Sequence, residues 1–115
     1  MIVLIDDERS FINPIDALVI RNSADALVWL DTTNPETHID QLWLDHDLGL
    51  VNGQKDSIIP FVRKLEELCF WDEAPQITEV VVHTSNSIGG DEIVASLKNH
   101  YKVQRVFAGD YLIVR

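Results

Sequence analysis

Cysteine, basic residues and long hydrophobic runs are all scarce in this sequence of 115 residues. Its single cysteine, Cys69, excludes an internal disulfide framework and is typical of proteins from a reducing compartment. The longest apolar run is far too short to cross a membrane, and no basic segment of a signal peptide precedes the first apolar run. We therefore expect a soluble cytoplasmic protein that folds as a single domain over residues 1–115.

The shortage of basic residues limits the ligands to be expected. Nine Lys and Arg stand against 19 Asp and Glu, so the formal net charge is −10 at pH 7. Proteins that bind long nucleic acids usually present a basic face, and this charge opposes tight binding to long double-stranded DNA. A small phosphorylated ligand stays compatible with the sequence, because a bound divalent cation can invert the local charge. A basic protein partner would also suit such an acidic chain.

Short apolar segments alternate with segments of helical periodicity, which is typical of βαβ units and a parallel sheet. Strands are expected at residues 2–5, 17–20, 42–44, 79–83 and 103–107. Helices are expected at residues 22–31, 57–71 and 91–100. Asn22 or Ser23 is the expected cap of the first helix, and Pro60 fits only the first turn of the second.

Two parts of the chain depart from this alternation. The connection from Asp6 to Asp16 contains Pro14 and shows little helical period, so we expect a loop or one short turn there. The apolar residues 111–114 follow Gly109-Asp110. They could form a hairpin with residues 103–107 at one edge of the sheet.

Polar residues directly follow three of the predicted strands. The first strand ends in Asp6-Asp7-Glu8, the third in Asp45-His46-Asp47-Leu48-Gly49 and the fourth in His83-Thr84-Ser85-Asn86. Open α/β sheets bind their ligands at the carboxyl ends of the strands. The sequence therefore predicts that carboxylates, imidazoles and hydroxyls meet at one edge of the sheet.

The carboxylates at these strand ends have two interpretations. Hard oxygen ligands from separate strands suit Mg²⁺, which usually takes one or two carboxylates and keeps several waters. Without a cation, crowded carboxylates would repel one another, and the pKa of at least one would rise. The alternative is that Asp6, Asp7, Glu8, Asp45 and Asp47 simply populate solvated loop starts.

The four histidines differ in their surroundings. His38 and His100 lie in polar stretches and are expected at the surface. His46 stands between two aspartates, where it could ligate a metal, act as an acid or base, or merely bond to a carboxylate. His83 ends an apolar strand and shares one strand face with Ser85. An imidazole and a hydroxyl placed in this way can hold a phosphate and exchange a proton with it.

Small residues connect the fourth strand to the last predicted helix. The segment from Ser85 to Asp91 includes Gly89 and Gly90. Small residues before a helix can form an anion-binding nest of backbone N–H groups. The same glycines could equally be no more than a flexible turn.

The order of these motifs resembles a receiver domain, the phospho-acceptor module of two-component signalling. The resemblance rests on an acidic pair after the first strand, an aspartate after the third and a hydroxyl after the fourth: Asp6, Asp7, Asp45, and Thr84 or Ser85. A divergent branch, the cyclic-phosphate processing receiver domain, is more similar still. Its LDHDLG-like segment matches residues 44–49, its HxSN-type segment and following Gly match residues 83–89, and its opening motif matches residues 4–9.

The resemblance spans residues 1–100 and implies a fold. It implies an α/β protein of the receiver-like, flavodoxin-like class, a three-layer α/β/α sandwich around a mostly parallel five-stranded sheet. The first helix of a receiver is expected to be short or absent here. This chain also lacks the Lys that normally ends the fifth strand of phospho-accepting receivers, because residues 103–110 contain none.

The resemblance also implies a function, namely binding or hydrolysis of a cyclic phosphate such as a 2′,3′-cyclic RNA end or a cyclic nucleotide. His46 and His83 would then act as acid and base. The phosphate would be bound by residues of the second motif and its glycine: Thr84, Ser85, Asn86 and Gly89. Mg²⁺ or another divalent cation would lie on Asp6, Asp7 and Asp45, with support from Asp47 and Glu8.

Two alternatives stay open. The first is a stand-alone receiver in which Asp45 accepts a phosphoryl group, although the missing Lys removes a group that stabilises the transfer. The second is a receiver-like protein without enzymatic activity that binds a protein partner.

Overall fold

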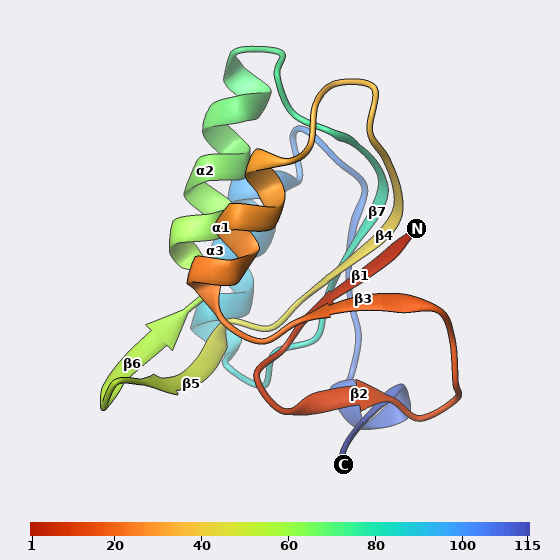
Figure 1. Ribbon diagram of the computed structural model, residues 1–115, viewed down its shortest axis with the longest axis vertical. Coiled ribbons are helices and arrows are strands. Elements are labelled where there is room, and N and C mark those ends of the chain that lie inside the picture. The colour runs from red at the N-terminus through yellow and green to blue at the C-terminus, as the bar shows by residue number, and fades with distance from the viewer.

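A five-stranded parallel sheet lies at the centre of the molecule, and the computed structural model describes all of residues 1–115 (Figure 1). The strands are β1 (Ile2–Ile5), β3 (Ala17–Ile20), β4 (His38–Leu44), β7 (Gln76–Val82) and β8 (Val103–Arg105). They pair in parallel in the order β3-β1-β4-β7-β8. Numbered among themselves in chain order, these strands run 2-1-3-4-5, which is the flavodoxin-like order. The predicted α/β fold class is confirmed.

All three helices cover one face of this sheet (Figure 1). They are α1 (Ser23–Asp31), α2 (Ile59–Phe70) and α3 (Ser87–Leu97). Of the two predicted caps of α1, Asn22 and Ser23, the structure has Asn22, whose side chain accepts a hydrogen bond from the N–H of Asp25. Pro60 lies in the first turn of α2, as predicted. The apolar stripes of the three helices and one side of the sheet form a single core: Ala26, Leu30, Phe61, Val62, Leu65, Ile93 and Leu97 against Val3, Ile5, Leu42, Leu44, Val80 and Val82.

The second face of the sheet is covered by a β-ribbon, so the predicted three-layer sandwich lacks its second layer of helices. The ribbon consists of β2 (Arg9–Phe11) and β9 (Leu112–Val114). The short 3₁₀ turn η1 (Ala108–Asp110) directly precedes β9. Leu112 joins a second buried cluster with Leu4, Trp43 and Val81. A ribbon takes this place because the connection between β1 and β3 forms no helix, as the sequence predicts.

The predicted hairpin between residues 103–107 and 111–114 is wrong. β9 pairs antiparallel with β2, with Phe11 opposite Leu112. β8 instead lies parallel to β7, and η1 then turns the chain beneath the sheet. The indole of Trp43 favours the pairing of β9 with β2, because Phe11 and Tyr111 both pack edge-on against it. Their ring centroids lie 5.0 and 5.3 Å from that of Trp43.

A hairpin that the sequence pattern does not predict projects beside the carboxyl ends of the strands (Figure 1). It consists of β5 (Asp47–Val51) and β6 (Gln54–Ser57). Asn52 and Gly53 form its tip with φ angles of 52° and 77°, the left-handed geometry of the tightest hairpin turns. The carboxylate of Asp56 accepts a hydrogen bond of 2.8 Å from the N–H of Ser23, which ties the hairpin to the start of α1.

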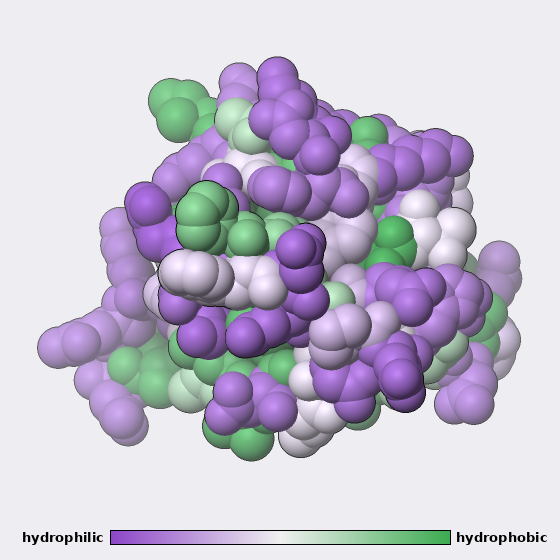
Figure 2. Space-filling view, turned by 90° about the horizontal axis from the view of Figure 1, so that it is seen from above, coloured by the Kyte–Doolittle hydropathy of each residue, from purple (hydrophilic) through white to green (hydrophobic).

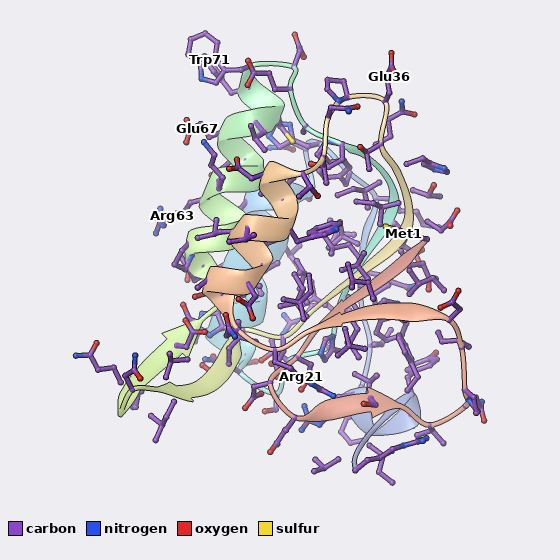
Figure 3. The ribbon with its side chains drawn as sticks, in the orientation of Figure 1. Met1, Arg21, Glu36, Arg63, Glu67 and Trp71 are labelled. Carbon is purple, nitrogen blue, oxygen red and sulfur yellow. The ribbon has the colours of Figure 1, made fainter.

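The opposite end of the molecule is mainly hydrophilic, with hydrophobic residues in small separate groups (Figure 2). Trp71 extends outward there from the end of α2 (Figure 3). None of the helices has the length and hydrophobicity needed to span a lipid bilayer.

The ribbon should contribute to stability through Leu112, which is 3% exposed. Leu112→Ala should lower the free energy of unfolding by about 2–5 kcal/mol, because it leaves a cavity against Trp43. The matched control is Ile113→Ala in the same strand, where the side chain is 47% exposed, and it should change stability by less than about 0.5 kcal/mol. Urea denaturation measures both values. Equal effects of the two substitutions would contradict the assigned packing of β9.

Candidate functional site

The carboxyl ends of three neighbouring strands bring Asp6, Asp45 and His83 together. They follow β1, β4 and β7, and one side-chain ligand atom from each lies within 4.8 Å of the others. All three residues are buried. Each backbone N–H donates to a carbonyl of a neighbouring strand at 3.1 Å, which extends the sheet by one residue and fixes where each side chain starts.

Asp6 is the most heavily bonded member of this cluster. Its Oδ1 accepts hydrogen bonds from the N–H groups of Glu8 and Arg9 at 2.9 and 2.8 Å, and its Oδ2 lies 3.0 Å from Nε2 of His83. Burial by itself raises the pKa of Asp6, but the bonds from His83 and the two N–H groups outweigh burial and lower the pKa to about 2. Asp6 is therefore ionised at neutral pH, and Nε2 of His83 carries the proton that it donates.

The pKa of Asp45 is shifted in the opposite direction to that of Asp6. Burial raises its pKa, the His83 imidazole opposes this increase, and the negative charge of Asp6 adds to it. The guanidinium of Arg9 partly compensates for the crowding, since its Nη1 lies 3.7 Å from Asp6 Oδ2 and 3.8 Å from Asp45 Oδ2. Arg9 was not among the predicted site residues, and only its place directly after the acidic motif links it to the site in sequence.

A second arginine fixes the loop that carries Asp6 and Arg9. Arg21 directly follows β3 and lies at the lower end of the sheet in Figure 3. Its Nη1 donates to the backbone carbonyls of Asp6 and Arg9, at 3.2 and 2.5 Å. The turn after β1 is therefore bonded from both sides, by Arg21 at its carbonyls and by the Asp6 carboxylate at its N–H groups.

His83 leaves one polar atom without a protein partner. His83 is 1% exposed. Its Nδ1 atom is buried and neither donates nor accepts a hydrogen bond within the protein. His83 also lines a pocket of about 230 Å³ next to the carboxyl edge. The other residues that line it come from the turn after β1, the end of β7 and the segment after β8: Arg9, Thr84, Ser85, Val106, Phe107, Ala108 and Gly109.

His46 lies outside the buried cluster, on the turn between β4 and β5. Its Nδ1 lies 2.9 Å from Oδ1 of Asp47, and the amide of Asn86 approaches the other Asp47 oxygen at 3.4 Å. The ring packs so closely on Gly89 that a Cβ there would lie 2.4 Å from Cδ2 of His46. His46 is thus oriented by Asp47 and Gly89, while its Nε2 makes no hydrogen bond to the protein.

The predicted phosphate nest partly serves as the cap of α3. Oδ1 of Asn86 accepts from the N–H of Gly89, and the carbonyl of Asn86 accepts from the N–H of Gly90, both at 2.8 Å. Thr84 Oγ1 accepts from the N–H of Asn86 at 3.1 Å. The hydroxyl of Ser85, in contrast, is exposed and lines the pocket beside His83.

The remaining predicted residues lie near the cluster but outside it. The Asp7 carboxylate turns away and packs against Gly49, where partial burial raises its pKa. The structure therefore groups Asp6 and Asp45 with His83 and leaves Asp7 apart. Glu8 and Asp47 are exposed, and Glu8 contributes only its backbone N–H to Asp6.

Comparison with known families identifies one match. The model of the cyclic-phosphate processing receiver domain matches residues 1–99 of the chain. This range includes all three polar strand ends and α3, whereas β8, η1 and β9 follow it. Comparison with curated proteins and with solved structures found no significant match.

The lowered pKa of Asp6 predicts a specific loss of stability in acid. A carboxyl group with a folded pKa of about 2 and an ordinary value of 3.8 stabilises the fold above pH 3.8 and loses this effect as the pH falls toward 2. The effect amounts to about 2 kcal/mol. Asp6→Asn should therefore lose most stability near neutral pH and differ least from the wild type near pH 2, as measured by urea denaturation across the pH range. Asp16→Asn in an exposed loop is the control, and a pH-independent effect of Asp6→Asn would contradict the prediction.

The contact between Gly89 and His46 can be tested by adding one methyl group. Gly to Ala inside a helix usually increases stability by about 1 kcal/mol. Gly89→Ala should not, because its Cβ would displace the His46 ring. The expected result is a shift of the His46 imidazole NMR signals with little change in those of His83. Ser87→Ala, at an exposed position in the same turn, is the control, and unchanged His46 signals in Gly89→Ala would refute the contact.

Proposed function

The chain belongs to the cyclic-phosphate processing receiver family, and from this premise we propose that it binds a cyclic phosphate at the carboxyl edge of the sheet and hydrolyses it. One observation carries the proposal: a buried Asp6–His83 pair whose second imidazole nitrogen has no partner, beside a pocket that also contains Ser85 and Arg9. Buried polar atoms normally have a hydrogen-bond partner, and leaving one without costs about 1–3 kcal/mol. A ligand or a bound water would supply that partner.

His83 is suited to transfer a proton. The Asp6 carboxylate holds the proton on Nε2, so in the neutral imidazole Nδ1 has the free lone pair. This arrangement supports a role as general base or, after protonation, as general acid. His46 has a similar arrangement, with Nδ1 held by Asp47 and Nε2 available.

The reaction requires one base and one acid. A water oxygen attacks the phosphorus and loses its proton to one imidazole, and one ring P–O ester bond breaks. The released sugar oxygen takes a proton from the other imidazole, and the product is a phosphate monoester. We assign these two roles to His46 and His83, which follow the adjacent strands β4 and β7.

Three polar groups beside His83 suit the phosphate oxygens. The exposed hydroxyl of Ser85 and the guanidinium of Arg9 line the same pocket, and Thr84 lies between Ser85 and His83 in the chain. A guanidinium placed here would stabilise the charge that develops on the phosphate. Because the N–H groups of Gly89 and Gly90 already donate to Asn86, we place the main phosphate contacts on Ser85 and Arg9.

A divalent cation is compatible with two of the three predicted ligands. Asp6 and Asp45 offer hard carboxylate oxygens close together. Burial and, to a lesser degree, the negative charge of Asp6 raise the pKa of Asp45, and a bound cation would oppose this increase. We propose that these two residues hold Mg²⁺, which when bound would polarise a phosphate oxygen. Asp7, packed on Gly49, is not placed to join them. Arg9 contacts the same two carboxylates, so the ion would compete with its guanidinium.

The phospho-acceptor alternative has less support. Asp45 is 7% exposed, and the only arginine or lysine within ion-pair distance of it is Arg9, at 3.8 Å. Treatment with a small phosphodonor and Mg²⁺ would label Asp45 if this alternative holds, and Asp45→Asn would abolish the label. Binding experiments with the labelled protein would then show whether a protein partner binds the phosphorylated form.

The proposal predicts hydrolysis of 2′,3′-cyclic nucleotides, measured by ³¹P NMR with and without Mg²⁺. His83→Ala should reduce turnover by about a hundredfold or more, and His46→Ala and Ser85→Ala should also reduce it. His83→Gln serves as a second variant in case the alanine variant unfolds. The control is His100→Ala, because His100 is exposed and follows α3 at the other end of the sheet. Absence of both turnover and binding in the wild type, or full activity in a folded His83 variant, would refute the proposal.

A further inference from the structure

The pocket beside His83 has two walls of different origin. Arg9, His83 and Ser85 form one wall, and they belong to the region matched by the family. The other wall consists of Val106, Phe107, Ala108 and Gly109, which follow the matched residues 1–99. The pocket therefore lies between the polar strand ends and a segment that follows the residues matched by the family.

Phe107 is exposed but held in position. Phe107 is 74% exposed and borders the pocket. Its carbonyl accepts a hydrogen bond from the N–H of Asp110 at 3.1 Å, and the preceding Val106 donates to a carbonyl of β7 at 2.9 Å. The ring lies over Gly109, where a Cβ would approach its Cε1 to 2.7 Å. The backbone and Gly109 thus present an aromatic ring at the rim of the pocket.

The groups around the pocket match the parts of a nucleotide. An exposed aromatic ring can stack on any base, and a guanidinium complements a phosphate. His83 contributes the buried Nδ1 that lacks a protein partner. A 2′,3′-cyclic phosphate is attached to the same ribose as its base, so one small ligand can reach both walls. The small pocket volume of about 230 Å³ suits part of one nucleotide, with the base on the exposed ring at the rim, and the net charge of −10 opposes a long strand.

We propose that this pocket is a nucleoside subsite in which the base stacks on Phe107 while the cyclic phosphate lies at His83, Arg9 and Ser85. The inference rests on the proposed function and makes it more specific, because it assigns the ligand as a nucleoside cyclic phosphate. Phe107 is then a specificity-determining residue, which contacts the base and does not take part in the proton transfers.

Binding to the full-length protein, measured by calorimetry, tests the subsite with three probes. They are 2′,3′-cyclic AMP, a short oligonucleotide that ends in a 2′,3′-cyclic phosphate, and glycerol 1,2-cyclic phosphate, which has no base. Phe107→Ala should weaken binding of the two nucleoside probes by about tenfold or more and change binding of the glycerol probe by less than about twofold. Phe107→Trp should restore the affinity for the nucleoside probes. The matched control is Phe70→Ala at the end of α2, because Phe70 is also 74% exposed.

The outcomes separate this inference from the proposed function. If the wild type binds the glycerol probe as tightly as 2′,3′-cyclic AMP, or if Phe107→Ala weakens all probes equally, the subsite is refuted while the phosphate site stands. If the wild type binds none of the probes, the proposed function fails and the subsite with it. Tighter binding of the oligonucleotide than of the mononucleotide would identify an RNA end as the ligand, and the reverse order would identify a free nucleotide. NMR transfer of magnetisation between base protons and the Phe107 ring would confirm the stacking directly.

Discussion

The hydrogen bond between the buried Asp6 carboxylate and His83 is the interaction on which the site depends. It connects the end of β1 to the end of β7 across β4, and neither side chain has contact with solvent. Burying a charged group is costly unless that group is paired and hydrogen-bonded. Asp6 meets this requirement with two backbone N–H groups in addition to His83. The turn after β1 must therefore keep its shape, and Arg21 fixes that turn from its carbonyl side.

The proposed phosphate site lies in an acidic chain, so it depends on the charges close to it. The net charge of −10 is an average over the whole molecule, whereas a phosphate interacts with the groups within a few ångströms of it. At the carboxyl edge, Arg9 lies against both buried carboxylates, and His83 adds a second proton donor. These contacts do not bury Arg9 completely, because its side chain is 29% exposed and also lines the pocket. The guanidinium of Arg9 thus offsets part of the negative charge where the ligand would bind.

The sequence predicts the parts of the fold that depend on local pattern. Short apolar runs and helical periodicity place the central strands and the helices, and the strand ends place Asp6, Asp45 and His83 at one edge. Pairing over long separations is not encoded locally, so the sequence pattern does not predict the contact of β2 with β9. The hairpin of β5 and β6 does not follow from the apolar pattern, because β6 contains no apolar residue, although Asn52-Gly53 is a recognised turn signal. The separation of Asp7 from Asp6 depends on the bend that follows β1 and on packing against Gly49, and the sequence pattern contains neither.

The segment after residue 99 has two structural roles that depend on each other. Through Leu112 it covers the face of the sheet that no helix covers, with Trp43 at the centre of the contact. To reach that position from the edge strand β8, the chain must turn beneath the carboxyl edge, and it does so at η1. That turn places Phe107 and Gly109 opposite His83. A helix in place of the ribbon would require a different exit from β8, so the replacement of the missing helical layer and the wall of the pocket follow from one path of the chain.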